Sequence, residues 1–131
     1  MENNLVVITD IRSPEALSLR DYLAGEGYEV LVVPQDLCLW DEQALTAFAK
    51  PLEDRLCGVI HPAPPRVLGG IDQVTEEDWA RARDEGPIAA LIVTKVFCGI
   101  FREKKEGSLI YLNSIHAEKP VGKGFLFSMG C

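Results

Sequence analysis

The sequence lacks the features that would mark a membrane, nucleic-acid or metal-binding protein. Its longest apolar run, Ile88 to Phe101, is interrupted by Thr94 and Lys95 and is too short to span a bilayer. The formal net charge of -7 argues against nucleic acid or an anionic membrane as the main partner. The two histidines, His61 and His116, have no ligand partner at a recognisable metal-binding spacing, so we expect no metal site.

Closely spaced cysteine pairs and a secretory leader are also missing. The four cysteines lie far apart, and none forms the C-x-x-C spacing of a metal or redox motif. The amino terminus, Met-Glu-Asn-Asn, is acidic and polar, unlike a signal peptide. We therefore expect reduced thiols in a cytoplasmic protein. At 131 residues, of which 47% are hydrophobic, residues 1–131 are expected to form a single domain with a substantial core.

What the sequence does contain is an alternation of short apolar runs with helical patterns. Continuous apolar runs of this kind are typical of strands buried on both faces. They lie at Leu5–Thr9, Glu29–Val33, Cys57–Ile60 and Leu109–Leu112. Such strands alternating with helices predict an α/β fold, a doubly wound parallel sheet with helices on both faces.

Helix-start signals stand between these runs. Ser13 followed by Pro14 predicts the start of the first helix, and Asp41 predicts the start of a short one ending near Lys50. The sequence Thr75-Glu-Glu-Asp78 predicts a capping box at the start of a third. We expect Gly86-Pro87 to break that helix and to restart a long helix that runs to about Lys104.

Several segments together resemble the short-chain dehydrogenase/reductase family. The clearest runs from Gly58 to Ser114: a strand, a turn with Ala63 at its centre, Thr-Glu-Glu-Asp-Trp, a long helix, then Gly-Ser-Leu-Ile and a serine. The resemblance covers most of the chain and implies a Rossmann-like fold. The family continues through another helix and further strands, whereas this chain ends at Cys131, where that helix would begin. The resemblance thus implies an incomplete domain, truncated after the fifth-strand region.

The same resemblance bears on the family cofactor, NAD or NADP. Asp10, Pro14 and Ala16 stand where the family has glycines that let the backbone approach a pyrophosphate. Asp10 would place a carboxylate beside the phosphates, and Pro14 removes a backbone donor. The second strand ends at Val33-Pro34 without an acid for the ribose, and only Asp36 can match an acid near the adenine. We therefore expect no nicotinamide cofactor to be bound.

The family's catalytic tetrad consists of Asn, Ser, Tyr and Lys. Ser114 matches the serine, but Gly86, Phe127 and Cys131 stand at the matching positions of the other three. The tyrosine is the family's proton donor, and phenylalanine has no proton to transfer. The resemblance therefore implies a degenerate relative that keeps only Ser114 as a remnant of the tetrad.

The leading hypothesis is a non-catalytic subunit that supports or regulates a catalytically active oxidoreductase of the same family. Heteromeric family members with one non-catalytic subunit exist, including hydroxybenzylsuccinyl-CoA dehydrogenase. The expected partner is an active paralogue or a second copy of the chain, and the expected contact is the helix at 88–104, as the family pairs this helix between subunits. The expected contact residues are Ile88, Leu91, Ile92, Lys95, Val96, Gly99 and Ile100.

Two other functions stay open. The chain could be an enzyme with altered chemistry that needs no dinucleotide, using Ser114 with His61 or His116 at the strand ends. It could instead be a ligand-binding or sensor module without an enzymatic partner.

Overall fold

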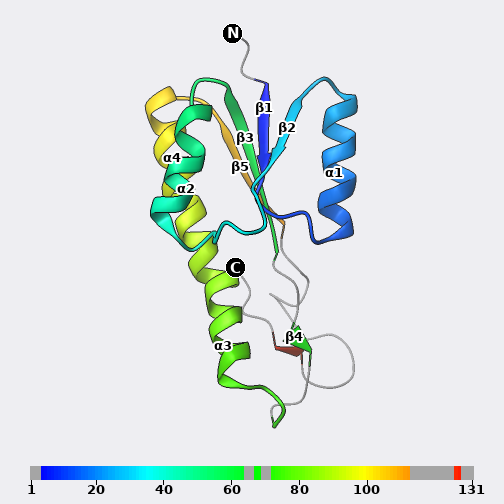
Figure 1. Cartoon of the computed structure of the whole chain (residues 1–131). Helices are drawn as coiled ribbons and strands as arrows, with labels where there is room; N and C mark the ends of the chain where they lie inside the picture. Colours follow the sequence, from blue (N-terminus) through cyan, green and yellow to red (C-terminus); the bar gives the residue numbers. More distant parts are fainter. Residues whose placement is uncertain (1–3, 64–66, 69–71, 113–125, 128–131) are drawn as a thin grey trace.

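A four-stranded parallel sheet forms the centre of the molecule (Figure 1). The structure is a computed structural model, which describes residues 4–63, 67–68, 72–112 and 126–127. The strands are β1 (Leu5–Ile8), β2 (Glu29–Val32), β3 (Leu56–Pro62) and β5 (Ser108–Leu112). Their order across the sheet is β2-β1-β3-β5, and all three pairings are parallel. The four apolar runs of the sequence thus form the strands that were predicted.

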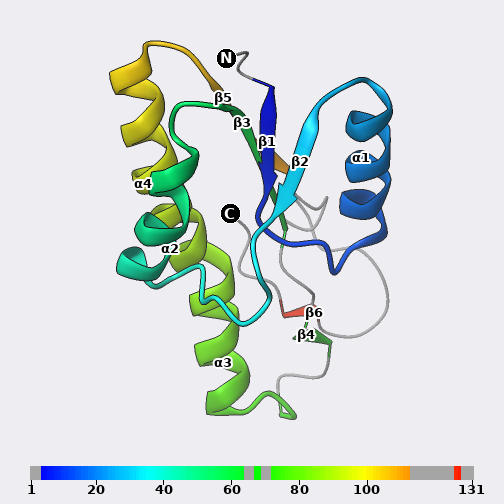
Figure 2. The same ribbon diagram turned by 45° about the horizontal axis from the view of Figure 1, so that its top comes forward.

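Helices cover both faces of the sheet, as predicted. Helix α1 (Pro14–Gly25) lies on one face, while α2 (Glu42–Ala49) and α4 (Ala89–Lys104) lie on the other (Figures 1 and 2). A short 3-10 helix, Lys50–Leu52, follows α2. The buried side chains divide accordingly into two clusters. The cluster under α1 contains Val6, Ile8, Ala16 and Ile60. The larger cluster under α2 and α4 contains Leu5, Val7, Val33, Leu45, Ala49, Leu52, Leu56, Val59, Val93, Phe97 and Phe101.

The predicted helix starts are confirmed. The Ser13 side chain accepts a hydrogen bond from the backbone N–H of Ala16 at 3.2 Å, and Pro14 occupies the first turn of α1. Asp41 caps α2 in the same way. At α3 (Glu76–Arg83) the Thr75 hydroxyl accepts from the backbone N–H of Asp78, and the Asp78 carboxylate accepts from the backbone N–H of Thr75. Each cap satisfies backbone donors that an uncapped helix leaves without partners.

The predicted break at Gly86-Pro87 is wrong. A π-helical turn, Asp84–Ile88, joins α3 to α4, so that Figure 1 shows one long helix from Glu76 to Lys104. Proline has no N–H to donate, and a wider turn lets the helix continue past the missing hydrogen bond. Gly86 is buried in this turn, and Ala89 and Val93 follow it into the core. Tertiary packing therefore holds the helix together where the local sequence predicts a break.

The end of α4 depends on two residues with positive φ. Lys105 adopts a left-handed conformation (φ 62°) and caps the helix. Gly107 follows at φ 138°, and a β-carbon at this position would overlap the ring of Phe101. The turn from α4 into β5 thus needs a residue without a side chain at Gly107.

A second, two-stranded sheet pairs β4 (Val67–Leu68) with β6 (Leu126–Phe127) in antiparallel register. The resemblance implies that a helix begins at Cys131, which lies outside the described residues, and the backbone at Phe127, four residues before it, is extended. Pairing with β4 satisfies backbone groups of β6 without a helix, and phenylalanine favours strands. Cys57 and Cys98 are both half-buried free cysteines.

Candidate functional site

Polar residues gather where the strands of the main sheet end. Thr9 and Asp10 follow β1, and His61 lies near the end of β3. Because the strands are parallel, their carboxyl ends meet at one edge of the sheet, where α/β proteins place their ligands. The segment from Pro34 to Trp40 runs from β2 to α2 past the same edge (Figure 1). This edge is therefore the candidate site.

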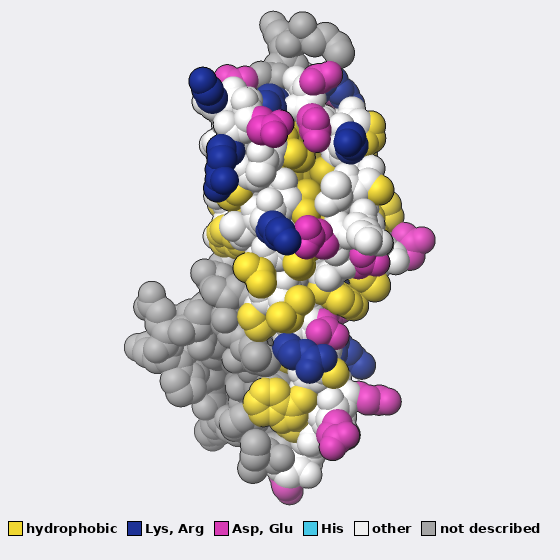
Figure 3. Space-filling view, turned by 90° about the vertical axis from the view of Figure 1, so that its left-hand side faces the viewer, with side chains coloured by type: hydrophobic (Ala, Val, Ile, Leu, Met, Phe, Trp, Pro, Cys, Tyr) yellow, Lys and Arg dark blue, Asp and Glu magenta, His cyan; other side chains and the backbone are white. Residues whose placement is uncertain are grey.

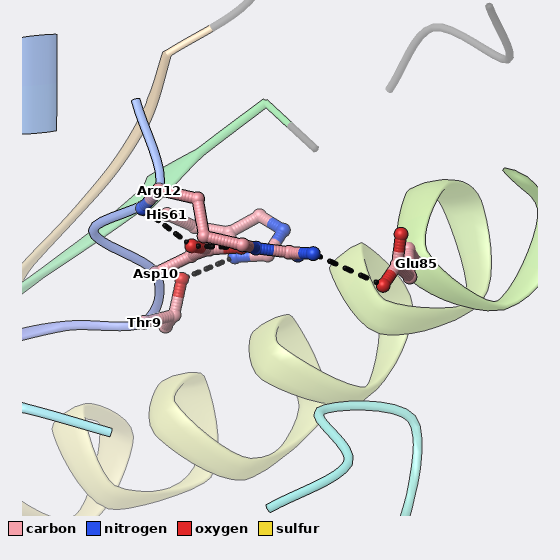
Figure 4. A network of polar contacts seen from close by, with 5 residues as sticks. All are labelled: Thr9, Asp10, Arg12, His61 and Glu85. Atoms are coloured by element: carbon pink, nitrogen blue, oxygen red, sulfur yellow. Dashed lines mark hydrogen bonds and ion pairs between the residues drawn. The ribbon is translucent and has the colours of Figure 1, made fainter. Parts of the chain in front are cut away.

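An arginine and two carboxylates form the polar centre of the edge (Figure 4). The Nε atom of Arg12 lies 2.8 Å from Oδ2 and 3.0 Å from Oδ1 of Asp10. Its Nη2 atom donates to Oδ2 at 2.5 Å, and the backbone N–H of Arg12 donates to Oδ1 at 2.8 Å. Asp10 is thus held by several charge-assisted hydrogen bonds, the strongest kind in proteins.

The arginine also reaches the long helix. Its Nη1 atom lies 3.3 Å from Oε1 of Glu85, which belongs to the π-helical turn. The hydrogen bond to Asp10, together with the nearby charges of Asp10 and Glu85, raises the pKa of Arg12, with burial acting in the opposite direction. The guanidinium therefore stays charged, and it ties the β1–α1 turn to the helix. We call Asp10, Arg12 and Glu85 the arginine network.

His61 lies next to the arginine network in a different environment. Its side chain is only 3% exposed, and its Nδ1 atom lies 2.7 Å from the Thr9 hydroxyl. Its ring meets the ring of Tyr111 edge to face at 5.8 Å. Burial lowers the pKa of His61 to about 4, although the charge of Asp10 raises it in part. The ring is therefore uncharged at pH 7.

These residues line a small cavity. Its volume is about 170 Å³, and its wall includes Thr9, Asp10, Arg12, His61 and Glu85. The rest of the wall is Val33, Pro34, Gln35, Leu37, Cys38, Leu39, Trp40 and Pro62. Pockets for drug-sized ligands usually measure about 300–1,000 Å³. The cavity is therefore smaller than a typical ligand pocket, and residues of the 34–40 segment form much of its wall.

The residues at the positions of the family glycines lie around this site. Asp10 belongs to the arginine network, Pro14 is the first residue of α1, and Ala16 is the buried residue of that helix. Asp36 is exposed and does not line the cavity. The turn after β1 is therefore a carboxylate–arginine pair followed by a capped helix, not an open loop.

The tetrad positions are described only in part. Gly86 is buried in the π-helical turn, one residue from Glu85. Ser114, His116 and Cys131 lie outside the described residues, and Phe127 is described only as part of β6. Whether His61 meets Ser114 or His116 therefore stays a prediction.

The expected contact residues of α4 fall into two groups. Ile92, Val96 and Ile100 pack against the larger core cluster, while Leu91, Lys95 and Gly99 are exposed and Ile88 is half-buried. Leu91 is 61% exposed, and Trp79 on α3 is 49% exposed. Lys95 also pairs with Glu42 of α2 at 2.9 Å. Figure 3 shows hydrophobic side chains among charges of both signs on this side of the molecule.

Sequence reasoning missed Thr9, Arg12 and Glu85. The Asp-x-Arg pattern at Asp10 and Arg12 is a local signal for their pairing, since a short acidic side chain often bonds backbone and side-chain donors two residues on. No local pattern indicates Glu85, which is 73 residues from Arg12. Only the three-dimensional arrangement of β1 and the long helix brings that pair together.

Neither a metal-binding cluster nor a membrane-spanning helix is present in the described part of the chain. Within it, no group of three His, Cys, Asp or Glu side chains could hold a metal ion. None of its helices is both long and apolar enough to cross a membrane.

Comparisons with known proteins show the fold. No protein-family model matches the chain, and no curated protein matches it. A short chain dehydrogenase from Leptospira borgpetersenii, solved with bound NAD+, matches with a TM-score of 0.80 at 12% identity, over 93% of this chain and 56% of that one. A short-chain oxidoreductase from Burkholderia thailandensis gives 0.79 at 15% identity, over 93% and 56%.

A sorbitol-6-phosphate 2-dehydrogenase from Erwinia amylovora matches with a TM-score of 0.75 at 15% identity, over 89% of this chain and 56% of that one. The chain thus spans little more than half the length of these structures. At such low identities the likeness concerns the fold alone. The chain has the Rossmann-like α/β fold of the short-chain dehydrogenase/reductase structures.

Proposed function

We propose that this chain is a non-catalytic relative of the short-chain dehydrogenases/reductases that supports or regulates a catalytically active oxidoreductase partner and binds neither NAD nor NADP. The single observation that carries the proposal is the arginine network at the strand ends. Asp10 and Arg12 occupy the turn where a dinucleotide of this fold class would bring its pyrophosphate, and Glu85 contacts Arg12 from the long helix.

The charges of the network oppose phosphate binding. Asp10 and Glu85 together carry two negative charges, and the positive charge of Arg12 is already engaged by both. A pyrophosphate beside them would meet net negative charge and would have to break the bonds from Arg12 to Asp10. Pro14 offers no N–H at the start of α1, which weakens the usual anion site of a helix start. Both effects lower the affinity for a nicotinamide dinucleotide.

The side chains at three of the four tetrad positions lack the family's functional groups. Gly86, Phe127 and Cys131 cannot replace the amide, the phenol and the ammonium group that they match, so Ser114 alone cannot complete proton transfer. The oxidoreductase activity is therefore assigned to the partner.

The partner is an active paralogue or a second copy of the chain, and it binds the long helix. Leu91, Lys95 and Gly99 lie four residues apart and share one exposed face of α4. The first turn of α3 is acidic, with Glu76, Glu77 and Asp78, and the last turn of α4 is basic, with Arg102 and Lys104. Two such helices packed antiparallel would place acidic ends against basic ends, which favours that orientation.

The alternative, an enzyme that uses His61 with Ser114 or His116, has weaker support. A general base works best when its pKa lies near the operating pH. Burial lowers the pKa of His61 to about 4, and its Nδ1 atom is engaged by Thr9. A ring in this environment is a weak base at neutral pH.

Calorimetric titration with NAD(H) and NADP(H) tests the loss of the cofactor. We expect no binding below millimolar concentrations. The double variant Asp10→Gly/Arg12→Gly removes the pair, and any gain in affinity would show that the network contributes to exclusion. Submillimolar binding by the unaltered chain would overturn the proposal.

Affinity capture tests the partner. The tagged chain, used as bait in an extract of its native cells, is expected to retain a short-chain dehydrogenase with an intact tetrad, or to sediment as a dimer when pure. A monodisperse monomer that captures no such protein would count against the proposed subunit role.

A further inference from the structure

Strand β5 forms one edge of the main sheet. It pairs with β3 in an unbroken parallel register, with residues 58–62 of β3 opposite Ser108–Leu112. No described strand pairs with the other side of β5, because the strand order of the sheet ends there. A strand at an edge leaves a row of backbone N–H and C=O groups that can pair with another chain. The outer side of β5 therefore offers a regular row of donors and acceptors that no described strand uses.

The side chains of β5 leave apolar surface exposed beside this edge. Paired residues of neighbouring strands lie on the same face, so Ile110 lies beside Ile60 on the face that carries α1. Ile60 is 6% exposed and Ile110 is 49% exposed, so the cover on this face reaches β3 but not β5. On the other face Tyr111 is 36% exposed, although its hydroxyl contacts that of Thr94 on α4. Both faces of the sheet thus present apolar surface at β5.

The two edges of the sheet differ in their protection against pairing. Proteins commonly block an edge with a charge, a proline or a bulge. At the opposite edge, β2 begins with Glu29, which pairs with Arg55 at 2.5 Å, and Pro34 follows closely after the strand. The sequence of β5, Ser-Leu-Ile-Tyr-Leu, contains no charge and no proline, and its register has no bulge. Of the two edges, β5 is therefore the one suited to pairing.

A second copy of the chain fits this edge. Two β5 strands related by a two-fold axis run antiparallel, and an axis at the central residue sets Ile110 opposite Ile110 and Leu109 opposite Tyr111. Every pair is uncharged, and cross-strand pairs of aromatic and aliphatic side chains stabilise a sheet. The strand is already ordered in the folded chain, whereas a flexible peptide would lose conformational entropy on binding. An identical copy thus meets the edge without charge repulsion and without a cost of ordering.

The exposed face of α4 continues this surface. The contact between the hydroxyls of Thr94 and Tyr111 places the middle of α4 beside β5. Leu91 lies three residues before Thr94, on the same side of the helix, and is 61% exposed. A two-fold axis that pairs the strands runs perpendicular to the sheet, so the two α4 helices lie on the same face of the joined sheet and run antiparallel. This is the helix orientation that the proposed function favours.

We propose that the outer edge of β5 is a self-association surface, at which the β5 strands of two copies pair antiparallel about Ile110 and join their sheets into one. The inference rests on the proposed function for the second copy as the partner, and it adds a strand contact to the helix contact. It does not depend on the loss of the cofactor. In this assembly β5 lies at the centre of the interface, and the exposed face of α4 lies beside it.

Hydrogen exchange of the unaltered full chain tests the edge directly. Sedimentation equilibrium first identifies the concentrations at which the chain is monomeric and dimeric. The outward amides of β5 are expected to exchange at least tenfold more slowly in the dimer than in the monomer, while the amides of β2 keep their rate. A contact through α4 alone would leave the edge of β5 open to water, so it would not give this pattern.

Two lysine substitutions form a matched pair. Ile110→Lys places a charge at the edge, as natural edge strands do, and should weaken association at least tenfold. Tyr28→Lys lies just before β2 at a residue that is 41% exposed, so it places the same charge at the opposite edge and should associate like the unaltered chain. Circular dichroism checks that each variant is folded. The exchange experiment decides the question without a variant if Ile110→Lys does not fold.

Several results would overturn the inference. These are a chain that stays monomeric at millimolar concentration, a dimer whose β5 amides exchange as in the monomer, and unchanged association of a folded Ile110→Lys variant. Protection of the β5 edge in the monomer would show that the chain's own residues occupy it. Protection only on binding of a captured paralogue would show that another protein occupies it. Either result contradicts a second copy at this edge.

The variant Leu91→Glu separates this inference from the proposed function. A dimer that is lost in Leu91→Glu but kept in Ile110→Lys supports the helix contact and overturns the strand contact. A Leu91→Glu dimer with protected β5 amides supports the strand contact and contradicts the helix contact. Loss of the dimer in both variants, with protected β5 amides in the unaltered chain, supports both.

Discussion

Arg12 and Glu85 join two parts of the chain that are 73 residues apart, with Nη1 of the arginine 3.3 Å from Oε1 of the glutamate. The same guanidinium holds Asp10 in the turn after β1. The turn that usually receives the phosphates of a dinucleotide is thus tied to a helix by the chain's own side chains. This relationship gives Asp10 and Arg12 a structural role in that turn.

Removal of the arginine should destabilise the fold. In Arg12→Ala the carboxylates of Asp10 and Glu85, which are 12% and 18% exposed, lose their counter-charge. Hydrogen bonds to charged groups are worth about 1.5–3 kcal/mol, and Arg12 is itself partly exposed, so we expect a loss of about 1–2 kcal/mol in the free energy of unfolding. Urea denaturation measures it.

The control for that experiment is Arg20→Ala. Arg20 pairs with Asp21 on the exposed surface of α1, where ion pairs contribute little. Its removal should change the free energy of unfolding by less than about 0.5 kcal/mol. An equal loss of unfolding free energy in the two variants would show that the arginine network stabilises the fold no more than an exposed ion pair does.

Protonation of His61 should make stability depend on pH. Its pKa is about 4 in the folded protein, below the ordinary value of 6.5. The unfolded chain therefore binds a proton between these values when the folded protein does not, so the free energy of unfolding rises with pH across this range. The contribution of His61 to the free energy of unfolding is complete above pH 6.5 and is lost as the pH falls toward 4. Its total size is on the order of 3 kcal/mol.

Denaturation curves of the unaltered chain and of His61→Gln at several pH values check this dependence. The difference between the two proteins isolates His61, because the carboxylates titrate in both. The difference in stability should shrink as the pH falls from 6.5 to 4. A constant difference across that range would mean that His61 is not the titrating group.

The regular elements could be predicted because their signals are local. Ser13, Asp41 and Thr75 each bond a backbone N–H within three residues, so the cap and its helix share one short stretch of sequence. Likewise, the burial of β1 on both faces is visible in its unbroken apolar run, Leu5–Ile8. The parallel order then follows from the alternation of strands and helices.

What could not be predicted depends on contacts between distant residues. The Gly86-Pro87 sequence predicts a break when considered alone, but packing of Gly86 and Ala89 in the interior keeps the helix continuous through a π-helical turn. That turn also places Glu85 opposite Arg12. The burial of His61 under Tyr111 similarly depends on the β3–β5 register, in which the two residues are partners.

Two glycine substitutions should have opposite effects. In Gly107→Ala the new β-carbon would overlap the ring of Phe101 at a backbone conformation (φ 138°) that other residues rarely adopt. We expect a loss of at least about 2 kcal/mol in the free energy of unfolding. In Gly99→Ala nothing lies within 4 Å of the new atom, and alanine in an exposed helix should stabilise by about 0.5–1 kcal/mol.

Thermal and urea denaturation of both variants provide the comparison. Both variants replace glycine with alanine, so the difference between their unfolding free energies reports the effect of the backbone conformation and packing at Gly107. Similar stabilities for the two variants would contradict the geometry of the turn between α4 and β5.

A charge placed on the exposed face of α4 should separate assembly from folding. Leu91 is 61% exposed, so Leu91→Glu is expected to leave the free energy of unfolding of the isolated chain within about 0.5 kcal/mol. If this face binds the partner, a buried carboxylate there should weaken association at least about tenfold, because an unpaired charge is costly at an interface. Capture of the paralogue, or sedimentation equilibrium for a self-dimer, measures this effect.

The matched control is Tyr22→Glu on α1, the helix of the opposite sheet face. Tyr22 is 64% exposed, so the two substitutions place the same charge at similarly exposed positions on opposite sides of the molecule. Only Leu91→Glu should weaken association, while both proteins stay folded by circular dichroism. Association that is equally strong in Leu91→Glu and in the unaltered chain would exclude this face of α4 as the contact, and a loss confined to Tyr22→Glu would place the contact on α1.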